Sequence, residues 1–145
     1  MKLKLILMCA VVAISLCLLA CSPVPKQVSV EASCDDFTKL QNISKEVEVP
    51  VGGSLTVTLC SNPTTGFEWE SAEISDQTVL RQIDHEYIAP EDGGDKPPAP
   101  GTPGQEVWTF KALNKGTSTI SVDYSRPWGG GEKGTWTFIL SVVVK

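Results

Sequence analysis

Two short segments of this 145-residue chain carry residue types that are unusual for plain turns. The first reads Asn62-Pro63-Thr64-Thr65-Gly66-Phe67. Pro63 fixes φ, Gly66 permits a positive φ, and the Asn62 amide can close on its own backbone, so two threonines are held outward. The second reads Arg126-Pro127-Trp128, followed by three glycines, and it combines two residue types enriched at interface hot spots. Together the segments predict a preformed protein-binding edge.

Catalytic chemistry has little support in the sequence. His85 is the only histidine, so a Ser/His/Asp or Cys/His arrangement has one candidate base. It lies in an expected strand between Asp84 and Glu86, and no titratable partner for it is evident, so we interpret it as an exposed strand histidine. The carboxylates of Glu91-Asp92-Gly93-Gly94-Asp95 match no calcium-loop spacing and are interpreted as a solvated acidic loop. We therefore expect no enzyme, no metal and no cofactor.

The elements that must position these segments are strands. Apolar residues alternate with polar ones through most of the chain after residue 27, and only residues 35–40 suggest a short helical turn. Expected strands cover residues 28–30, 47–49, 55–60, 66–70, 79–87, 106–112, 117–124 and 135–144. About seven short strands separated by turns predict an all-β, immunoglobulin-like antiparallel sandwich. Trp69, Trp108 and Trp136 are in phase with apolar neighbours and are expected in its core.

Three loops of this sandwich should emerge at the same end. Successive antiparallel connections alternate between the two ends, which groups residues 61–66, 88–105 and 125–134 (hereafter the first, second and third loops). They are also the three connections with unusual composition. Trp128, in the third loop, is either a binding anchor or a side chain folded back over the sandwich end, and we favour the anchor. Arg126 either ties down its own loop or contacts a partner.

The N-terminus predicts export. Lys2 and Lys4 precede an apolar run that is shorter than a membrane span and ends in Leu18-Leu19-Ala20-Cys21. We expect residues 1–20 to be a signal peptide, Cys21 to be lipidated, residues 21–27 to be a tether, and residues 28–145 to form the domain; an ordinary cleaved signal is the alternative. The protein would then lie outside the cytoplasm, in the cell envelope, held to the membrane by its N-terminal lipid or otherwise secreted.

Charge and cysteines agree with that compartment. Loss of residues 1–20, which hold two lysines, leaves 10 basic and 17 acidic side chains and a net charge of −7. An acidic chain without a basic stripe argues against binding nucleic acid or anionic lipid surfaces. Cys34 and Cys60 remain as an even pair, and we predict a disulfide between them rather than two buried thiols.

Three segments resemble the motifs of one family, the chagasin-like inhibitors of papain-type cysteine peptidases. They are Asn62-Pro63-Thr64-Thr65-Gly66-Phe67, then Gly101-Thr102-Pro103-Gly104, then Arg126-Pro127-Trp128. The middle segment departs from the family's Gly-x-Gly pattern because Pro103 stands at the second glycine. The likeness spans about residues 47–145.

The resemblance implies a monomeric inhibitor that occludes the peptidase cleft with three loops, reversibly and without a covalent step. Thr64 and Thr65 would approach the catalytic thiolate and imidazolium. Residues 101–104 would run beside the non-primed subsites through backbone hydrogen bonds, and Trp128 would pack on an aromatic surface of the primed side. The alternative is a cell-surface carbohydrate- or protein-binding sandwich without inhibitory activity, because many functions share this fold.

Overall fold

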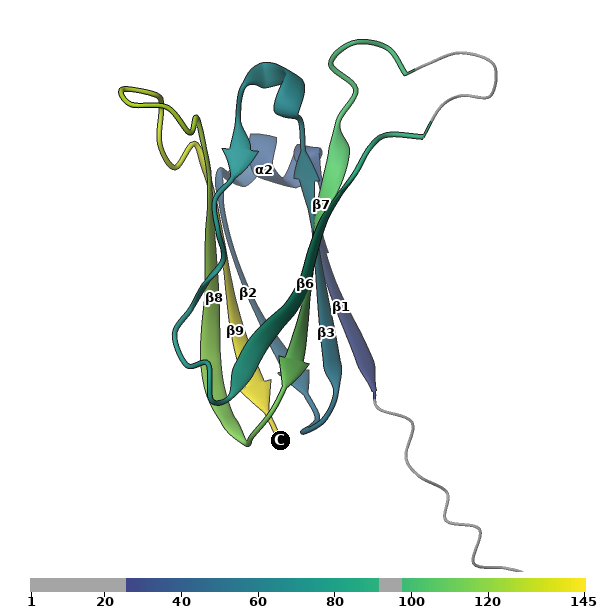
Figure 1. The fold of residues 1–145 in the computed structure, drawn as a ribbon, viewed down its shortest axis with the longest axis vertical. Helices are drawn as coiled ribbons and strands as arrows, with labels where there is room; N and C mark the ends of the chain where they lie inside the picture. Colours follow the sequence, from purple (N-terminus) through teal and green to yellow (C-terminus); the bar gives the residue numbers. More distant parts are fainter. Residues whose placement is uncertain (1–25, 92–97) are drawn as a thin grey trace, which may run out of the picture.

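The computed structural model describes residues 26–91 and 98–145 of the chain. The predicted signal peptide, Cys21, most of the predicted tether, and residues 92–95 of the acidic loop lie outside these ranges. The fold is a sandwich of two sheets packed face to face (Figure 1). One sheet has the strand order β1-β3-β7-β6 and the other β2-β9-β8-β4, with β5 also paired to β8.

The expected immunoglobulin-like β-sandwich is confirmed, and most strands lie within two residues of their predicted ranges. The exceptions are β2, which begins five residues earlier than predicted, and β5, which was not predicted. The elements are β1 (Gln27–Ala32), α2 (Cys34–Leu40), β2 (Asn42–Val49), β3 (Ser54–Ser61), a 3-10 turn (Pro63–Thr65), β4 (Glu68–Trp69), β5 (Glu73–Ile74), β6 (Leu80–Ile88), β7 (Gly104–Ala112), β8 (Gly116–Ser125) and β9 (Trp136–Val144).

Pairing differs from the prediction at two places. β1 runs parallel to β3 and β2 runs parallel to β9, whereas the other strand pairs of the described residues are antiparallel. Parallel neighbours require a crossover, and here the chain crosses from one sheet to the other through α2. The N-terminal segment therefore adds one edge strand to each sheet and covers the end of the sandwich between them.

The core follows the alternation seen in the sequence. Leu55, Val57 and Leu59 of β3 and Phe138, Leu140 and Val142 of β9 are all buried and belong to one core cluster. Trp69 and Trp108 are buried as predicted, whereas Trp136 is partly buried and packs against the edge of the core. Burial of these apolar faces is the main force that holds the two sheets together.

The short helix α2 is fixed at its start by a capping box. Ser33 accepts a hydrogen bond from the Asp36 N–H (3.2 Å), and the Asp36 carboxylate accepts one from the Ser33 N–H (2.9 Å). The Ser33 hydroxyl also donates to this carboxylate (2.7 Å), and the hydrogen bonds from the hydroxyl and the N–H lower the pKa of Asp36. Phe37 is completely buried, so the helix acts as a plug at this end of the core. Within the two described ranges, no helix is long and apolar enough to cross a membrane.

Candidate functional site

All three loops emerge at the end of the sandwich that α2 covers, as predicted (Figure 1). The turns that follow β2 and β7 lie at the opposite end, together with the C-terminus. Two direct contacts then join the three loops to one another. Asn62 of the first loop donates a side-chain hydrogen bond to the carbonyl of Gly101 in the second (2.8 Å). Gly66 of the first loop lies against the ring of Trp128 in the third.

The first loop is a 3-10 turn that is held by its own hydrogen bonds. The Thr65 N–H and hydroxyl both donate to the Asn62 carbonyl (3.1 and 2.7 Å), and the Thr64 hydroxyl donates to the Asn62 side-chain oxygen (2.6 Å). Gly66 ends the turn with φ +78°, as its glycine predicted. Pro63, Thr64 and Thr65 are exposed. Their backbone and methyl groups therefore form the tip of the loop, while both hydroxyls are engaged beneath it.

Asn62 plays a different part from the one expected. Its side chain makes no capping bond to its own backbone and instead reaches the second loop at Gly101. Its backbone N–H donates to the hydroxyl of the buried Tyr124 in β8 (2.8 Å). Asn62 is thus the point at which the first loop is joined both to the second loop and to the core.

The second loop has a tight turn at its described end. The N–H and hydroxyl of Thr102 both donate to the Ala99 carbonyl (3.0 and 2.6 Å), and Gly101 has φ +86°. Gly104 is the buried first residue of β7. A Cβ at Gly104 would lie 2.4 Å from the Ile88 carbonyl oxygen, so only glycine fits there. The residues of this segment that reach the surface are Gly101, Thr102 and Pro103.

In the third loop, Trp128 is 52% exposed. A Cβ on Gly66 would lie 2.9 Å from its Cη2 atom, so the edge of the indole rests on the glycine backbone while much of the ring stays open. The Arg126 guanidinium lies 4.5 Å from the centre of the Phe67 ring and 5.9 Å from that of Trp128. Arg126 therefore ties its own loop to Phe67, the residue that follows the first loop, by cation–π contact, which favours the structural interpretation of this residue.

An aromatic stack supports the loops from below. Phe37 stacks on Trp136 (centroids 5.2 Å apart), Trp136 on Tyr124 (4.9 Å), and Tyr124 on Phe67 (5.6 Å), with ring planes within 22° of parallel. The stack runs from Phe37 in α2 to Phe67, the ring against which the Arg126 guanidinium packs. The sequence did not identify Phe37, Tyr124 and Trp136 as supports of the site. Alternation of apolar residues predicts which side chains are buried, but it does not show which other side chains they pack against.

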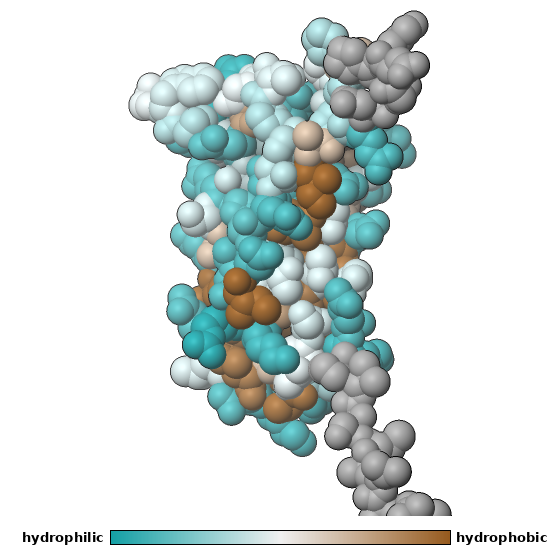
Figure 2. Space-filling view, turned by 45° about the vertical axis from the view of Figure 1, so that its right-hand side comes forward, coloured by the Kyte–Doolittle hydropathy of each residue, from teal (hydrophilic) through white to brown (hydrophobic). Residues whose placement is uncertain are grey.

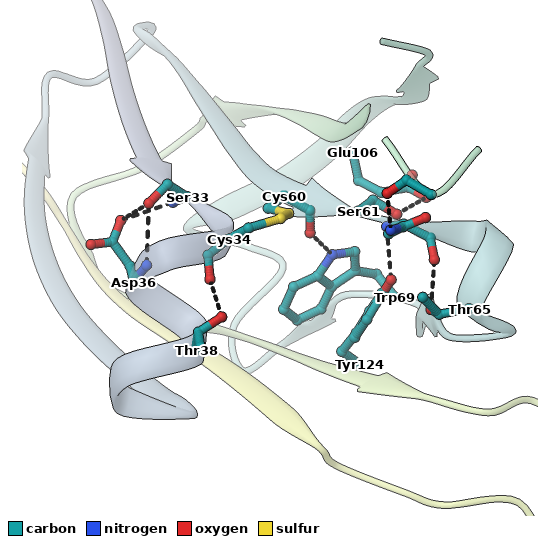
Figure 3. The surroundings of a disulfide bond; sticks show 12 residues. Ser33, Cys34, Asp36, Thr38, Cys60, Ser61, Thr65, Trp69, Glu106 and Tyr124 are labelled. Atoms are coloured by element: carbon teal, nitrogen blue, oxygen red, sulfur yellow. Dashed lines mark hydrogen bonds between the residues drawn. A yellow bond between two sulfur atoms is a disulfide. The ribbon is translucent and has the colours of Figure 1, made fainter. Parts of the chain in front are cut away.

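The predicted disulfide between Cys34 and Cys60 is present. It joins the first residue of α2 to β3, two positions before Asn62 (Figure 3). The indole N–H of Trp69 donates to the Cys60 carbonyl (2.9 Å), which holds the same point of β3 from the core side (Figure 3). The strand that leads into the first loop is therefore fixed immediately before the loop begins.

His85 has a partner that the sequence did not reveal. Its Nε2 lies 2.7 Å from Oε2 of Glu106, a buried residue of the neighbouring strand, and its ring stacks on Trp108. The Ser61 hydroxyl contacts the other oxygen of Glu106 (3.5 Å). The carboxylate thus lies between the serine and the histidine, so this contact does not set the imidazole to activate the hydroxyl as a nucleophile. In residues 26–91 and 98–145, no three His, Cys, Asp or Glu side chains group as a metal site would need.

Comparison with known proteins identifies the family. Residues 48–142, well over half of the chain, match the family described as Chagasin family peptidase inhibitor I42. The chain belongs to the chagasin family. It is similar to Amoebiasin-2 of Entamoeba histolytica, with 32% identity over 91 residues, which are 63% of this chain and 70% of that protein. The resemblance expected from three loop motifs is thereby confirmed, as is a function in cysteine peptidase inhibition.

Solved structures agree on the fold of this chagasin-family chain. It is similar to the crystal structure of the cysteine protease inhibitor EhICP2 from Entamoeba histolytica, with a TM-score of 0.61, 22% identity, and coverage of 84% of this chain and 100% of that one. It is also similar to PbICP-C, solved in complex with falcipain-2, with a TM-score of 0.53, 17% identity, and coverage of 81% and 99%. At these identities the likeness shows a shared fold.

Proposed function

We propose that this chagasin-family protein inhibits papain-type cysteine peptidases reversibly, by filling the catalytic cleft with its three loops. The observation that carries the proposal is the direct joining of the loops, by the Asn62–Gly101 hydrogen bond and the Gly66–Trp128 contact. Three segments that are far apart in the sequence form one continuous edge. The similarity to PbICP-C, whose solved partner is falcipain-2, supports a papain-type peptidase as the target.

Each loop has a distinct place in the proposed complex. The exposed tip at Thr64 and Thr65 would face the catalytic thiolate and imidazolium. The exposed part of the second loop, Gly101 to Pro103, would offer backbone groups to the non-primed subsites, with Gly104 shaping the loop from its buried position. The open face of Trp128 would cover an aromatic surface on the primed side, where a half-exposed indole can bury a large area.

The rigidity of the first loop explains why it would inhibit rather than be cleaved. A substrate must present an extended carbonyl to the thiolate, but residues 63–65 form a 3-10 turn closed by two backbone hydrogen bonds. Pre-ordering also saves about 0.5–1.5 kcal/mol of ordering entropy for each side chain already immobilised. A peptidase would therefore bind the loop tightly without reaching a geometry in which the peptide bond can be attacked.

Titration of papain with residues 21–145 tests the proposal. We expect stoichiometric loss of activity, recovery of activity on dilution, and an inhibitor that mass spectrometry finds intact and unmodified after long incubation. A covalent adduct or a cleaved first loop would contradict the mechanism. Absence of inhibition at micromolar protein would favour the alternative, a binding module that keeps the fold. Size-exclusion chromatography of the free protein should show the expected monomer.

We also propose that the protein is exported and held at the membrane through a lipid on Cys21. The support is the charged and apolar N-terminal pattern, together with the Cys34–Cys60 disulfide, a bond typical of oxidising compartments. Metabolic labelling with an alkyne fatty acid should label the full chain and leave the Cys21→Ser variant unlabelled. Equal labelling of both would exclude Cys21 as the modified residue.

A further inference from the structure

A groove of about 560 Å³ is bordered by the second loop and adjoins the edge that the three loops form. Its walls are the junction of β1 with α2, the end of β6, and the base of the second loop. Its lining includes Cys34, Cys60, Ile88, Glu91, Thr102 and Pro103. Ligand-binding pockets commonly enclose about 300–1,000 Å³, so the groove is large enough to receive a side chain or a small ligand.

The lining of the groove is mainly apolar. Ile88 is 44% exposed at the end of the edge strand β6, and both cysteines of the disulfide belong to the lining. Figure 2 shows apolar patches on this side of the molecule within a surface that is otherwise largely hydrophilic. A lining of this kind stabilises an aliphatic chain by removing it from water.

The described lining of the groove carries one negative charge. Among the described residues that line it, Glu91 is the one ionisable side chain. Ser33, also in the lining, donates from its N–H and its hydroxyl to the Asp36 carboxylate (2.9 and 2.7 Å); Lys45 and Lys39 also act on this carboxylate, so Glu91 supplies the charge on which the proposal depends. Hydrogen bonds from Ser33 hold the pKa of Asp36 below its usual value, so this carboxylate remains charged at neutral pH.

The groove is continuous with the proposed peptidase contact. Thr102 and Pro103 form part of its wall, and both belong to the stretch of the second loop that we place beside the non-primed subsites. A peptidase that covers the second loop would therefore also cover one wall of the groove. Any side chain that projects from the rim of the peptidase cleft at that point would enter it.

We propose that this groove receives a lysine or arginine side chain from the rim of the target peptidase's cleft and thereby selects among papain-type enzymes. The proposal rests on the proposed function. Lysine and arginine combine a long aliphatic stem with a cationic head. The stem would lie along Ile88 and the disulfide, and the head would face Glu91. Such a partly exposed charge pair affects mainly specificity and the association rate, and salt weakens it.

Four variants test the proposal with matched controls. Glu91→Lys reverses the charge in the groove, and Glu86→Lys makes the same change of net charge further down β6. Ile88→Ser removes the apolar contact, and Ile83→Ser removes an isoleucine of similar exposure (57%) from the same strand away from the loop end. All four sites are exposed, so each variant should fold. The inhibition constant and association rate are measured against papain and a panel of cathepsins.

For the peptidases that the wild type inhibits most tightly, we expect Glu91→Lys and Ile88→Ser to raise the inhibition constant at least tenfold. The control variants Glu86→Lys and Ile83→Ser should change the inhibition constant less than twofold. High salt should reduce the increase in the inhibition constant that Glu91→Lys causes. If Glu91→Lys changes the inhibition constant less than twofold for every inhibited enzyme, the groove proposal is wrong, while the proposed function still stands. An equal effect of Glu86→Lys would also overturn it, because net charge would then be the cause. A wild type that inhibits none of the enzymes would overturn both proposals.

Discussion

Replacing Tyr124 by phenylalanine tests whether the first loop is held in advance by the core. Tyr124 is 3% exposed, so its side chain cannot touch a partner protein. Its hydroxyl accepts the Asn62 N–H (2.8 Å), while its ring stacks between Phe67 and Trp136. Phenylalanine keeps the stack and removes only the acceptor at the root of the loop.

The expected magnitude follows from that one bond. A net hydrogen bond of this kind contributes about 1 kcal/mol, and Asn62 is only partly buried, so water can replace some of it. The melting temperature should fall by about 4 °C. If the first loop of the variant must be ordered on binding, the binding free energy should weaken by up to about 1 kcal/mol. The inhibition constant should then rise about three- to fivefold.

Calorimetry and a papain titration on the same preparations measure both quantities, with Tyr87→Phe as the control because Tyr87 is the only other tyrosine. A melting temperature that falls while the inhibition constant stays unchanged would refute the reasoning. In that case the Asn62–Gly101 bond and the turn's own hydrogen bonds would be sufficient to hold the loop. No change in either quantity would show that the hydroxyl has no role.

Four further outcomes are expected. Trp128→Ala should weaken inhibition by at least about 2 kcal/mol, roughly thirtyfold, without lowering the melting temperature; a change below a few tenths of a kcal/mol would make Trp128 a structural residue. Thr65→Asp should place a carboxylate at the tip of the first loop and raise the inhibition constant, and an unchanged constant would remove this loop from the cleft. The double variant Cys34→Ser/Cys60→Ser should lose about 3.5 kcal/mol in urea unfolding, because the bond closes a loop with a sequence separation of 26; an unchanged unfolding curve would contradict this. Hydrogen bonds from Thr78 lower the pKa of Asp76 from 3.8, so the ionised carboxylate stabilises the fold above that pH, and this stabilisation is lost as the pH falls through the lowered pKa. Asp76→Asn should therefore lower the melting temperature near pH 7 and make the melting temperature less sensitive to acid. Identical melting temperatures of the variant and the wild type at every pH would contradict this prediction.

Local pattern was sufficient for much of the fold. Strict alternation in residues 135–144 identified both the strand and its buried face, because side chains of a strand alternate with a period of two. The shared end of the three loops followed from the alternating direction of antiparallel strands. The disulfide followed from two cysteines left in a chain that the N-terminal pattern predicts to be exported.

The features that the sequence did not reveal depend on which strands pair, on their register, and on contacts between residues far apart in the chain. A period of two marks a strand but not its neighbour, so the parallel pairing of β1 and β2 was not predicted. Asn62 bonds to Gly101 across 39 positions, and only the folded end brings the two together. The contact between His85 and Glu106 follows a register shift between Gln82 and Asp84, and such a bulge has no clear mark in the sequence.

The direction in which β1 enters the sandwich has a practical consequence. Gln27 pairs with Ser54, next to the turn that follows β2, and the strand then runs toward the loops. Gln27, the first residue of β1, therefore lies at the pole opposite the three loops. A membrane, a bead or a fluorescent label attached there would leave Thr65 and Trp128 pointing outward, free to meet an approaching enzyme.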